Sequence, residues 1–104
     1  MTNEKLKSLF QFYYDHLIRM HEGVRAEALS NSDTRERVFR FSTEKRVSHL
    51  LHVCQTAIAF VDAGRVPKAM RWLGFLQGAL WSHGYFALDD LKHHSMPDNE
   101  KGVP

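Results

Sequence analysis

Residues 67–81 read PKAMRWLGFLQGALW, and this segment constrains the fold more than any other part of the chain. Pro67 suits the first position of a helix, where its missing N–H is no loss and its fixed φ angle fits. Lys68 and Arg71 stand near the start, and the remainder is apolar on nearly every side. A helix of that kind is buried in a core or in an interface. The segment therefore predicts a buried helix with a cationic beginning.

The preceding residues predict a second helix that pairs with it. Residues 43–62 place apolar side chains at alternating spacings of three and four, which is typical of a helix packed lengthwise against another. These residues are Val47, Leu50, Cys54, Ala57 and Val61. Further apolar side chains broaden this seam, so we expect the helix to pack against more than one neighbouring element. Ser42 or Thr43 supplies the cap and Ala63-Gly64 the stop. Because a short link then leads into Pro67, the helices over 43–62 and 67–83 form an antiparallel hairpin.

A helix from about Glu4 to His21 is expected to flank this hairpin. Asn3 can cap it, Glu4 suits its N-terminal dipole, and Gly23 lies just beyond its end. Its apolar residues recur at helical spacing. They are Leu6, Leu9, Phe10, Tyr13, Leu17 and Met20.

The other segments are less regular. Residues 24–29 are compatible with one or two further helical turns before a Ser-Asn-Ser-Asp turn. Residues 35–41 fit a helix or an extended run, and we favour the helix because the surroundings are helical. Residues 88–94 predict a short helix with two aspartates in its first turn. The tail, 95–104, has almost nothing to bury and is expected to be disordered. We therefore predict an all-α protein, a small helical bundle with a single domain over residues 1–94.

Composition excludes several classes of function. The formal charge is +2 and cations alternate with carboxylates, so the clustered positive face of a nucleic-acid-binding protein is not expected. Cys54 is the single cysteine and has apolar helix neighbours, which predicts a buried, unreactive thiol and a reducing compartment. No apolar run reaches the length of a signal-peptide core or a membrane span. We expect a soluble, cytoplasmic protein whose partners include no membrane and no sequence-specific nucleic acid.

Catalysis has little support in the sequence. His49 and His52 are three residues apart and are the best candidates for metal ligands, but no carboxylate stands beside them at helical ligand spacing. The chain contains no GxSxG elbow, no P-loop and no GxGxxG. We expect no metal, no cofactor and no enzymatic activity, and a metal-dependent enzyme is the third and weakest hypothesis.

The cationic start of the helix at Pro67 is the best candidate for a binding site. A helix N-terminus offers free N–H groups and a partial positive charge to an anion, and Lys68 and Arg71 add donors beside them. Trp72 offers a stacking surface for a base, which aromatic side chains from elsewhere could complete. The candidates are Tyr13, Tyr14, Trp81 and Tyr85. The alternative is that Trp72 belongs to the core and that the two cations pair with carboxylates.

Two surfaces are candidates for contacts with other chains. Gly74 and Gly78 share one helix face, and each costs about 0.5–1 kcal/mol relative to alanine, which suggests that another backbone packs there. With Trp81, this face predicts a homo-oligomer interface. The second surface is on the first helix, where aromatic residues at 10, 12, 13 and 14 cover too wide an arc for one core face. Some of them are expected to be exposed or to lie in an interface.

From about His49 to Pro97 the chain resembles a group of small proteins encoded by tailed bacteriophages. Their shared pattern is RWLGF-x-QG-x-LW, then a turn with an aromatic residue and a short acidic helix leading to a proline. It is matched here by residues 71–75, 77–78 and 80–81, Tyr85, residues 88–92 and Pro97. The resemblance implies a phage accessory protein in the bacterial cytoplasm, of a kind that often counters host defence by binding a host protein or sequestering a nucleotide signal.

The leading hypothesis is therefore non-enzymatic binding of a host component. In its most specific form the component is a phosphate-bearing nucleotide, held by Lys68, Arg71 and an aromatic platform. The runner-up is an inhibitor that binds a host protein through the aromatic face of the first helix.

Overall fold

The structure is a computed structural model and describes residues 1–96. Its α-helices are α1 (Asn3–Met20), α2 (Thr43–Asp62), α3 (Val66–Ser82) and α4 (Leu88–Ser95). Two 3-10 turns, Asp33–Arg35 and Val38–Arg40, lie between α1 and α2, and the described residues form no strand. The prediction of an all-α fold is confirmed.

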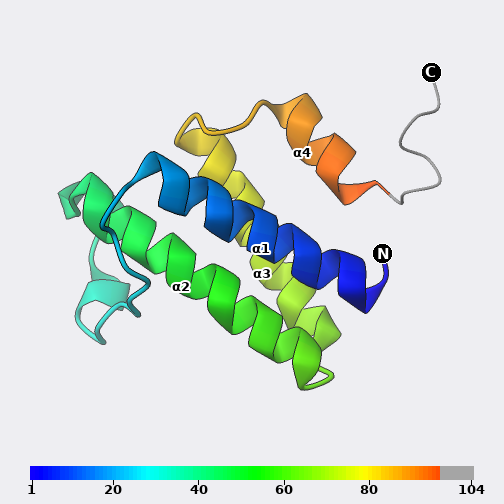
Figure 1. The fold of residues 1–104 in the computed structure, drawn as a ribbon. Coiled ribbons are helices and arrows are strands. Elements are labelled where there is room, and N and C mark those ends of the chain that lie inside the picture. Colours follow the sequence, from blue (N-terminus) through cyan, green and yellow to red (C-terminus); the bar gives the residue numbers. More distant parts are fainter. Residues whose placement is uncertain (97–104) are drawn as a thin grey trace.

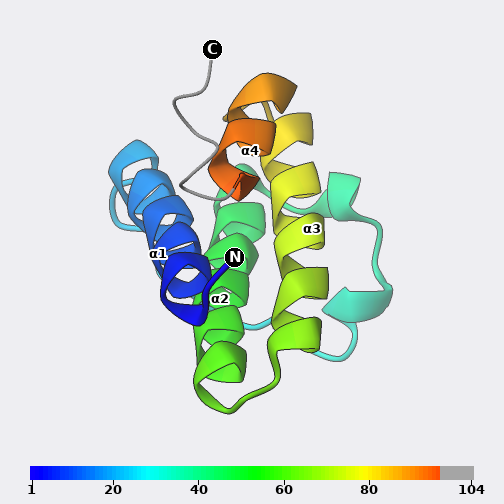
Figure 2. The same cartoon turned by 90° about the vertical axis from the view of Figure 1, so that its right-hand side faces the viewer.

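The central helix is α2, and both α1 and α3 pack against it in antiparallel orientation (Figure 1). Between α2 and α3 the chain reverses at Gly64, whose φ of +78° is a left-handed conformation that favours glycine. The predicted hairpin and its flanking helix are therefore confirmed. Figure 2 shows α1 on one side of this hairpin and the 3-10 segment on the other.

The core lies where the three long helices meet. All five residues of the predicted α2 seam are buried, and α1 and α3 contribute mainly leucines. Of the residues predicted for the apolar face of α1, Met20 is the exception. It is 59% exposed because it is the last residue of the helix, just before the chain turns at Gly23. Thr2, and not Asn3 as predicted, caps α1, since its hydroxyl accepts a hydrogen bond from the Lys5 N–H at 3.1 Å.

The segment between α1 and α2 differs from the prediction. Residues 24–29 add no helical turn, because they lie along α2 instead: the Glu27 N–H donates to the Ser48 carbonyl, and the Ser48 hydroxyl donates to the Arg25 carbonyl. The helix predicted over 35–41 is replaced by the two 3-10 turns, because Glu36 and Arg37 adopt extended backbone between them.

The last helix, α4, is tied to the bundle by a small polar network. Gln77 donates both amide hydrogens, to the Tyr13 hydroxyl at 3.0 Å and to Ser95 Oγ at 3.0 Å. The Tyr13 hydroxyl in turn bonds to His94 Nδ1 at 2.8 Å. Ser95 thus belongs to the folded domain and not to the tail, because its hydroxyl accepts one of these bonds. The disorder predicted for residues 97–104 lies outside the described residues.

Candidate functional site

Three cations gather at the beginning of α3. Arg65 is the N-cap residue, and Lys68 and Arg71 follow at the spacing of one helical turn. The cap makes no side-chain hydrogen bond, and Pro67 is the second residue of α3, one position later than predicted, because the helix begins at Val66. The first N–H groups of α3 therefore receive no acceptor from the cap side chain, and the partial positive charge of the helix end adds to the three side-chain charges.

The carboxylate closest to these cations along the chain is already engaged. Asp62 Oδ1 lies 2.9 Å from Lys7 Nζ, a contact that joins the end of α2 to the start of α1. None of the ion pairs formed among residues 1–96 involves Arg65, Lys68 or Arg71. The alternative in which carboxylates neutralise Lys68 and Arg71 thus has no counterpart in the described residues.

Aromatic rings support this cationic end of the hairpin. The ring centroids of Phe60 and Trp72 are 5.1 Å apart, with the rings nearly perpendicular at 88°. Lys68 Nζ lies 4.6 Å from the Phe60 centroid, and the Arg65 guanidinium carbon lies 5.3 Å from it. These cation–π contacts fix two of the three cations against the surface. Trp72 is half-buried, and Arg71 is exposed.

The tyrosines predicted for the aromatic platform are not brought to this site. Tyr13 is 0% exposed, and burial raises the pKa of its hydroxyl to about 12. Tyr85 bonds to His21 beyond the other end of α3, and about 20 Å of helix separates Lys68 from Ser82. Tyr14 lies between α1 and α2, where its hydroxyl accepts from Gln55 at 3.4 Å. Of the predicted platform, the structure brings only Trp72 to the cations.

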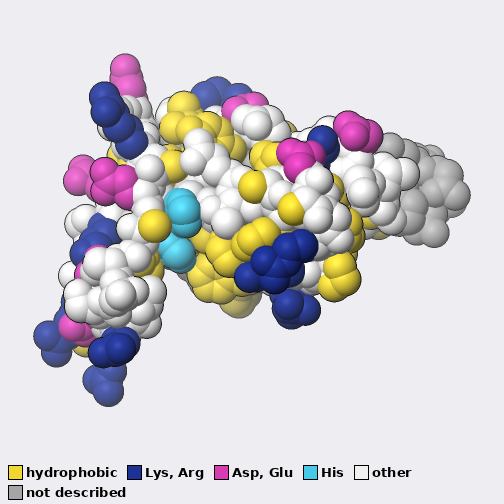
Figure 3. Space-filling view, turned by 90° about the horizontal axis from the view of Figure 1, so that it is seen from below, with side chains coloured by type: hydrophobic (Ala, Val, Ile, Leu, Met, Phe, Trp, Pro, Cys, Tyr) yellow, Lys and Arg dark blue, Asp and Glu magenta, His cyan; other side chains and the backbone are white. Residues whose placement is uncertain are grey.

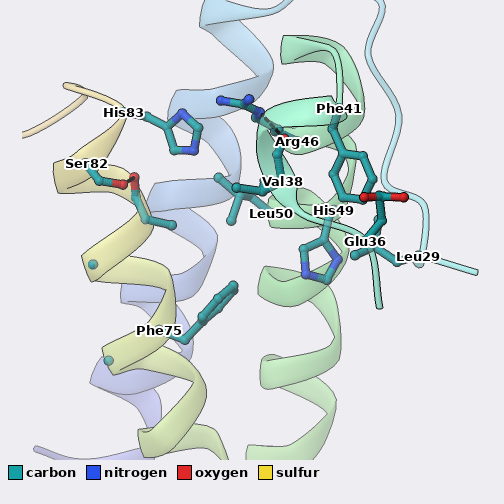
Figure 4. Close-up of a pocket in the computed structure, with 13 residues that line it drawn as sticks. Leu29, Glu36, Val38, Phe41, Arg46, His49, Leu50, Phe75, Ser82 and His83 are labelled. Atoms are coloured by element: carbon teal, nitrogen blue, oxygen red, sulfur yellow. Dashed lines mark hydrogen bonds between the residues drawn. The ribbon is translucent and has the colours of Figure 1, made fainter. Parts of the chain in front are cut away.

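A cleft among the described residues was not predicted from the sequence. It has a volume of about 560 Å³ and lies between α2, α3 and the 3-10 segment. Its lining is mainly apolar, and Figure 4 shows His49 projecting from α2 toward Phe75 of α3, with Arg46 and His83 at one end. The sequence signals that could have revealed it are the apolar residues Val38 and Phe41 in an otherwise charged segment.

A smaller hollow of about 160 Å³ continues the cleft toward the beginning of α3. It is lined by His49, Val53, Trp72 and Phe75, and it shares His49 and Phe75 with the cleft. Arg71 precedes Phe75 by four residues, so the two side chains are neighbours on the same face of α3. The cationic end of the hairpin and the apolar hollow therefore form one continuous surface.

His49 is the polar group of this hollow. Its Nδ1 atom is buried and has no hydrogen-bond partner among the described residues. Burial, and then the neighbouring His52, lower the pKa of His49 below its usual value, so the ring is neutral near pH 7. A neutral imidazole offers one donor and one acceptor. His49 thus keeps one buried ring nitrogen without a hydrogen bond, and this atom is closed to a ligand in the hollow.

The face of α3 that carries Gly74 and Gly78 is open and borders the cleft, since both glycines line it. A Cβ added at Gly74 or Gly78 would meet no atom within 4 Å, so no backbone of the described chain packs on these glycines. Trp81 is 57% exposed, and Arg71 is the only charged residue between positions 69 and 82. Figure 3 shows hydrophobic side chains gathered on one surface of the molecule, with His on one side and Lys and Arg next to them. The interface predicted for this face requires a partner from outside the chain.

The groups available at this surface are cations, aromatic rings and one imidazole. Within residues 1–96, His49 and His52 gain no third ligand, since no three His, Cys, Asp or Glu side chains are placed to hold a metal ion. Cys54 is buried as predicted, and burial raises the pKa of its thiol to about 12. Unpaired cations beside an apolar hollow with one neutral imidazole can hold an anion that carries an aromatic part.

Comparison of the chain with models of protein families, with curated proteins and with solved structures finds no match. The resemblance to phage proteins therefore stays a prediction. Of the helices described, none combines the length and the apolar character needed to cross a membrane.

Proposed function

We propose that this protein is a non-enzymatic binding protein that captures a phosphate-bearing nucleotide at the beginning of α3. One observation carries the proposal. Lys68 and Arg71 stand at a helix N-terminus without a side-chain cap, and no carboxylate of the described residues pairs with them, because Asp62 is engaged by Lys7. Such an arrangement favours a phosphate by the helix dipole and by charge-assisted hydrogen bonds.

The two cations have different roles in this proposal. Arg71 is exposed, and its planar guanidinium can bind two phosphate oxygens at once. Lys68 is held over Phe60 and contributes a point charge. Trp72, fixed by its edge contact with Phe60, supplies the aromatic surface next to them.

The biological setting is proposed from the resemblance to phage proteins. In that setting the protein is a phage accessory protein in the bacterial cytoplasm, and it opposes a host defence by sequestering a nucleotide signal without changing it. Mass spectrometry of the small molecule that copurifies with the native protein tests this directly. An intact nucleotide supports sequestration, whereas a nucleotide that the protein converts into a product supports an enzyme.

We further propose that the protein acts as a homo-oligomer through the face that carries Gly74, Gly78 and Trp81. The support is that the two glycines, which weaken an isolated helix, have no packing role inside the described chain. Sedimentation across micromolar concentrations tests the proposal. A monomer throughout this range removes it.

The second candidate is an inhibitor that binds a host protein. The aromatic face of α1 offers little surface for this, because Phe10 and Tyr13 are buried and Phe12, although 41% exposed, packs on Phe86. The exposed apolar side chains Phe75 and Trp81 of α3 favour this candidate instead.

Calorimetric titration of cyclic and linear nucleotides tests the binding proposal. Arg71→Ala should cost about 1.5–3 kcal/mol of affinity, as expected for a hydrogen bond to a charged group, and should leave helical content unchanged. Lys68→Ala should cost less, because lysine lacks the bidentate fork. Lys92→Ala, which removes an exposed cation of α4, is the matched control and should bind as wild type does. If the wild type binds no nucleotide, or if Arg71→Ala unfolds the protein, the proposal is wrong and protein inhibition becomes the better account.

A further inference from the structure

We infer that the cleft between α2, α3 and the 3-10 segment is a second binding site, whose ligand is an apolar molecule that ends in one carboxylate, as a fatty acid does. The carboxylate lies at the end of the cleft that holds Arg46 and His83, and the apolar body lies along the rest of it. This site is separate from the proposed nucleotide site, since neither Lys68 nor Arg71 lines the cleft.

The size and the lining of the cleft fit a small amphipathic molecule. Its volume of about 560 Å³ lies within the range of about 300–1,000 Å³ that is typical of ligand pockets, which are mostly apolar with a few polar groups. Leu50, Phe75 and Val38 reach it from its three sides (Figure 4). Because Val38 is 55% exposed and Phe75 is 56% exposed, an apolar ligand would remove apolar surface from water.

The wall on α3 is open where its glycines lie. Gly74 and Gly78 both line the cleft, and a Cβ added at either position would meet no atom within 4 Å. The absence of side chains at these two positions leaves this part of the cleft free for a ligand.

The wall formed by the 3-10 segment is held in place before a ligand enters. Arg46 Nε donates to the Val38 carbonyl at 3.1 Å. Lys45 Nζ pairs with Asp33 Oδ1 at 2.9 Å and lies 4.7 Å from the centroid of the Phe41 ring. Groups that are fixed before binding lose little freedom when the ligand enters.

The acidic side chain of the cleft is already neutralised. Glu36 lines the cleft, and its Oε1 atom lies 3.3 Å from Arg40 Nε and accepts the Arg37 N–H at 2.9 Å. Arg40 does not itself line the cleft. The carboxylate of Glu36 is therefore occupied by groups of its own segment and does not compensate a charge elsewhere in the cleft.

Arg46 is the cation that this leaves uncompensated. Its side chain is half-buried, and within residues 1–96 it forms no ion pair. Figure 4 shows Arg46 of α2 and His83 at the same end of the cleft. A guanidinium matches a carboxylate in charge and shape, and an imidazole ring offers an N–H donor in either tautomer. One arginine in a mainly apolar lining suits a ligand with a single anionic group.

Titration calorimetry with three probes tests the assignment. Octanoate carries the apolar chain and the carboxylate, octan-1-ol carries the chain without the charge, and acetate carries the charge without the chain. The wild type should bind octanoate more tightly than octan-1-ol and should not bind acetate. Arg46→Met should lower the ratio of the octanoate affinity to the octan-1-ol affinity by about 10-fold or more, as expected when a hydrogen bond to a charged group is lost. The ratio isolates the carboxylate, because a change in the cleft wall affects both chains alike.

Three further variants complete the test. Arg46→Lys keeps the charge and should retain most of this ratio. Arg25→Met makes the same change as Arg46→Met at an exposed arginine outside the cleft and should bind the probes as the wild type does. Gly74→Leu places a side chain in the cleft and should abolish binding of octanoate and octan-1-ol. Circular dichroism should show unchanged helical content, because a Cβ at this position meets open space.

The assignment is wrong if the wild type binds octanoate no better than octan-1-ol, or if Arg46→Met leaves the affinity ratio unchanged. It is also wrong if the wild type binds none of the probes, and sedimentation of the wild type and Gly74→Leu then shows whether a second copy of the chain occupies the cleft instead. Titration of nucleotides is a separate measurement, so failure of this site and failure of the proposed function are distinguishable.

Discussion

Replacing both Gly74 and Gly78 by alanine separates the stability of the chain from its self-association. Within the chain each new methyl group meets open space, so only the helix propensity changes. Each substitution should then stabilise the fold by about 0.5–1 kcal/mol, or about 1–2 kcal/mol for the pair. For a domain of this size, 1 kcal/mol corresponds to roughly 4–8 °C in Tm. We expect the dilute double variant to melt higher than the wild type.

In the proposed oligomer the same methyl groups stand between two backbones. Overpacking of that kind typically costs about 1–3 kcal/mol, so the double variant should associate more weakly while it unfolds less readily. Urea denaturation at low protein concentration measures the first effect, and sedimentation velocity at higher concentration measures the second.

A matched control is available at Gly23. A Cβ there also meets no atom within 4 Å, but the residue has a φ of +85°. Gly23→Ala should therefore destabilise the fold by about 1–2 kcal/mol although it adds the same methyl group to equally open space. A dilute Gly74→Ala/Gly78→Ala variant that is less stable than the wild type would refute the conclusion that the α3 face is open in the folded chain.

Two further predictions concern polar groups in the interior. Tyr13→Phe removes the hydroxyl that bonds to Gln77 and His94 in a partly buried network, and it should lower the free energy of unfolding by about 1–3 kcal/mol, measured by urea denaturation. Tyr14→Phe, which removes a single exposed bond of 3.4 Å, should change it less, and equal losses would contradict the assigned network. Burial lowers the pKa of both His16 and His49 from the ordinary value of 6.5, so the unfolded chain binds more protons than the folded one below that pH. The part of the free energy of unfolding that these two histidines contribute should therefore be present above pH 6.5 and be lost as the pH falls below it. His49→Phe should make the decline shallower.

The helices follow from local chemistry, and the sequence therefore predicts them well. Ser42 accepts a hydrogen bond from the Lys45 N–H, and Gly64 takes the left-handed conformation that ends a helix, so the bounds predicted for α2 agree with the structure. The buried seam follows because a spacing of three and four fixes which side chains share a face.

The segment between α1 and α2 depends on contacts that are distant in sequence. Lys45 Nζ pairs with Asp33 Oδ1 at 2.9 Å, and Arg46 Nε donates to the Val38 carbonyl at 3.1 Å. No local pattern encodes such partners, so the sequence does not predict the 3-10 turns, and the signal it gives for the cleft that they border is the pair of apolar residues Val38 and Phe41.

In the candidate site, too, the part that depends on local sequence is predictable and the part that depends on tertiary contacts is not. The cations at the start of α3 follow from Pro67, which marks the beginning of a helix. The aromatic platform does not follow, because a tyrosine at a seam position can serve either as a core residue or as a surface residue. Tyr13 is buried, since Gln77 and His94 satisfy its hydroxyl inside the bundle.

The attachment of α4 has a consequence for the dynamics of the fold. This helix buries one residue, Leu91, and its other contacts with the bundle include the bonds of Tyr13 and Gln77 and the packing of the His94 ring on Phe12, Tyr13 and Phe86. Few contacts have to break for it to detach, so α4 should behave as a separate unit of local opening. Its amide hydrogens should exchange with solvent at a lower free energy than those in the middle of α2, which are released only when the three long helices unfold together.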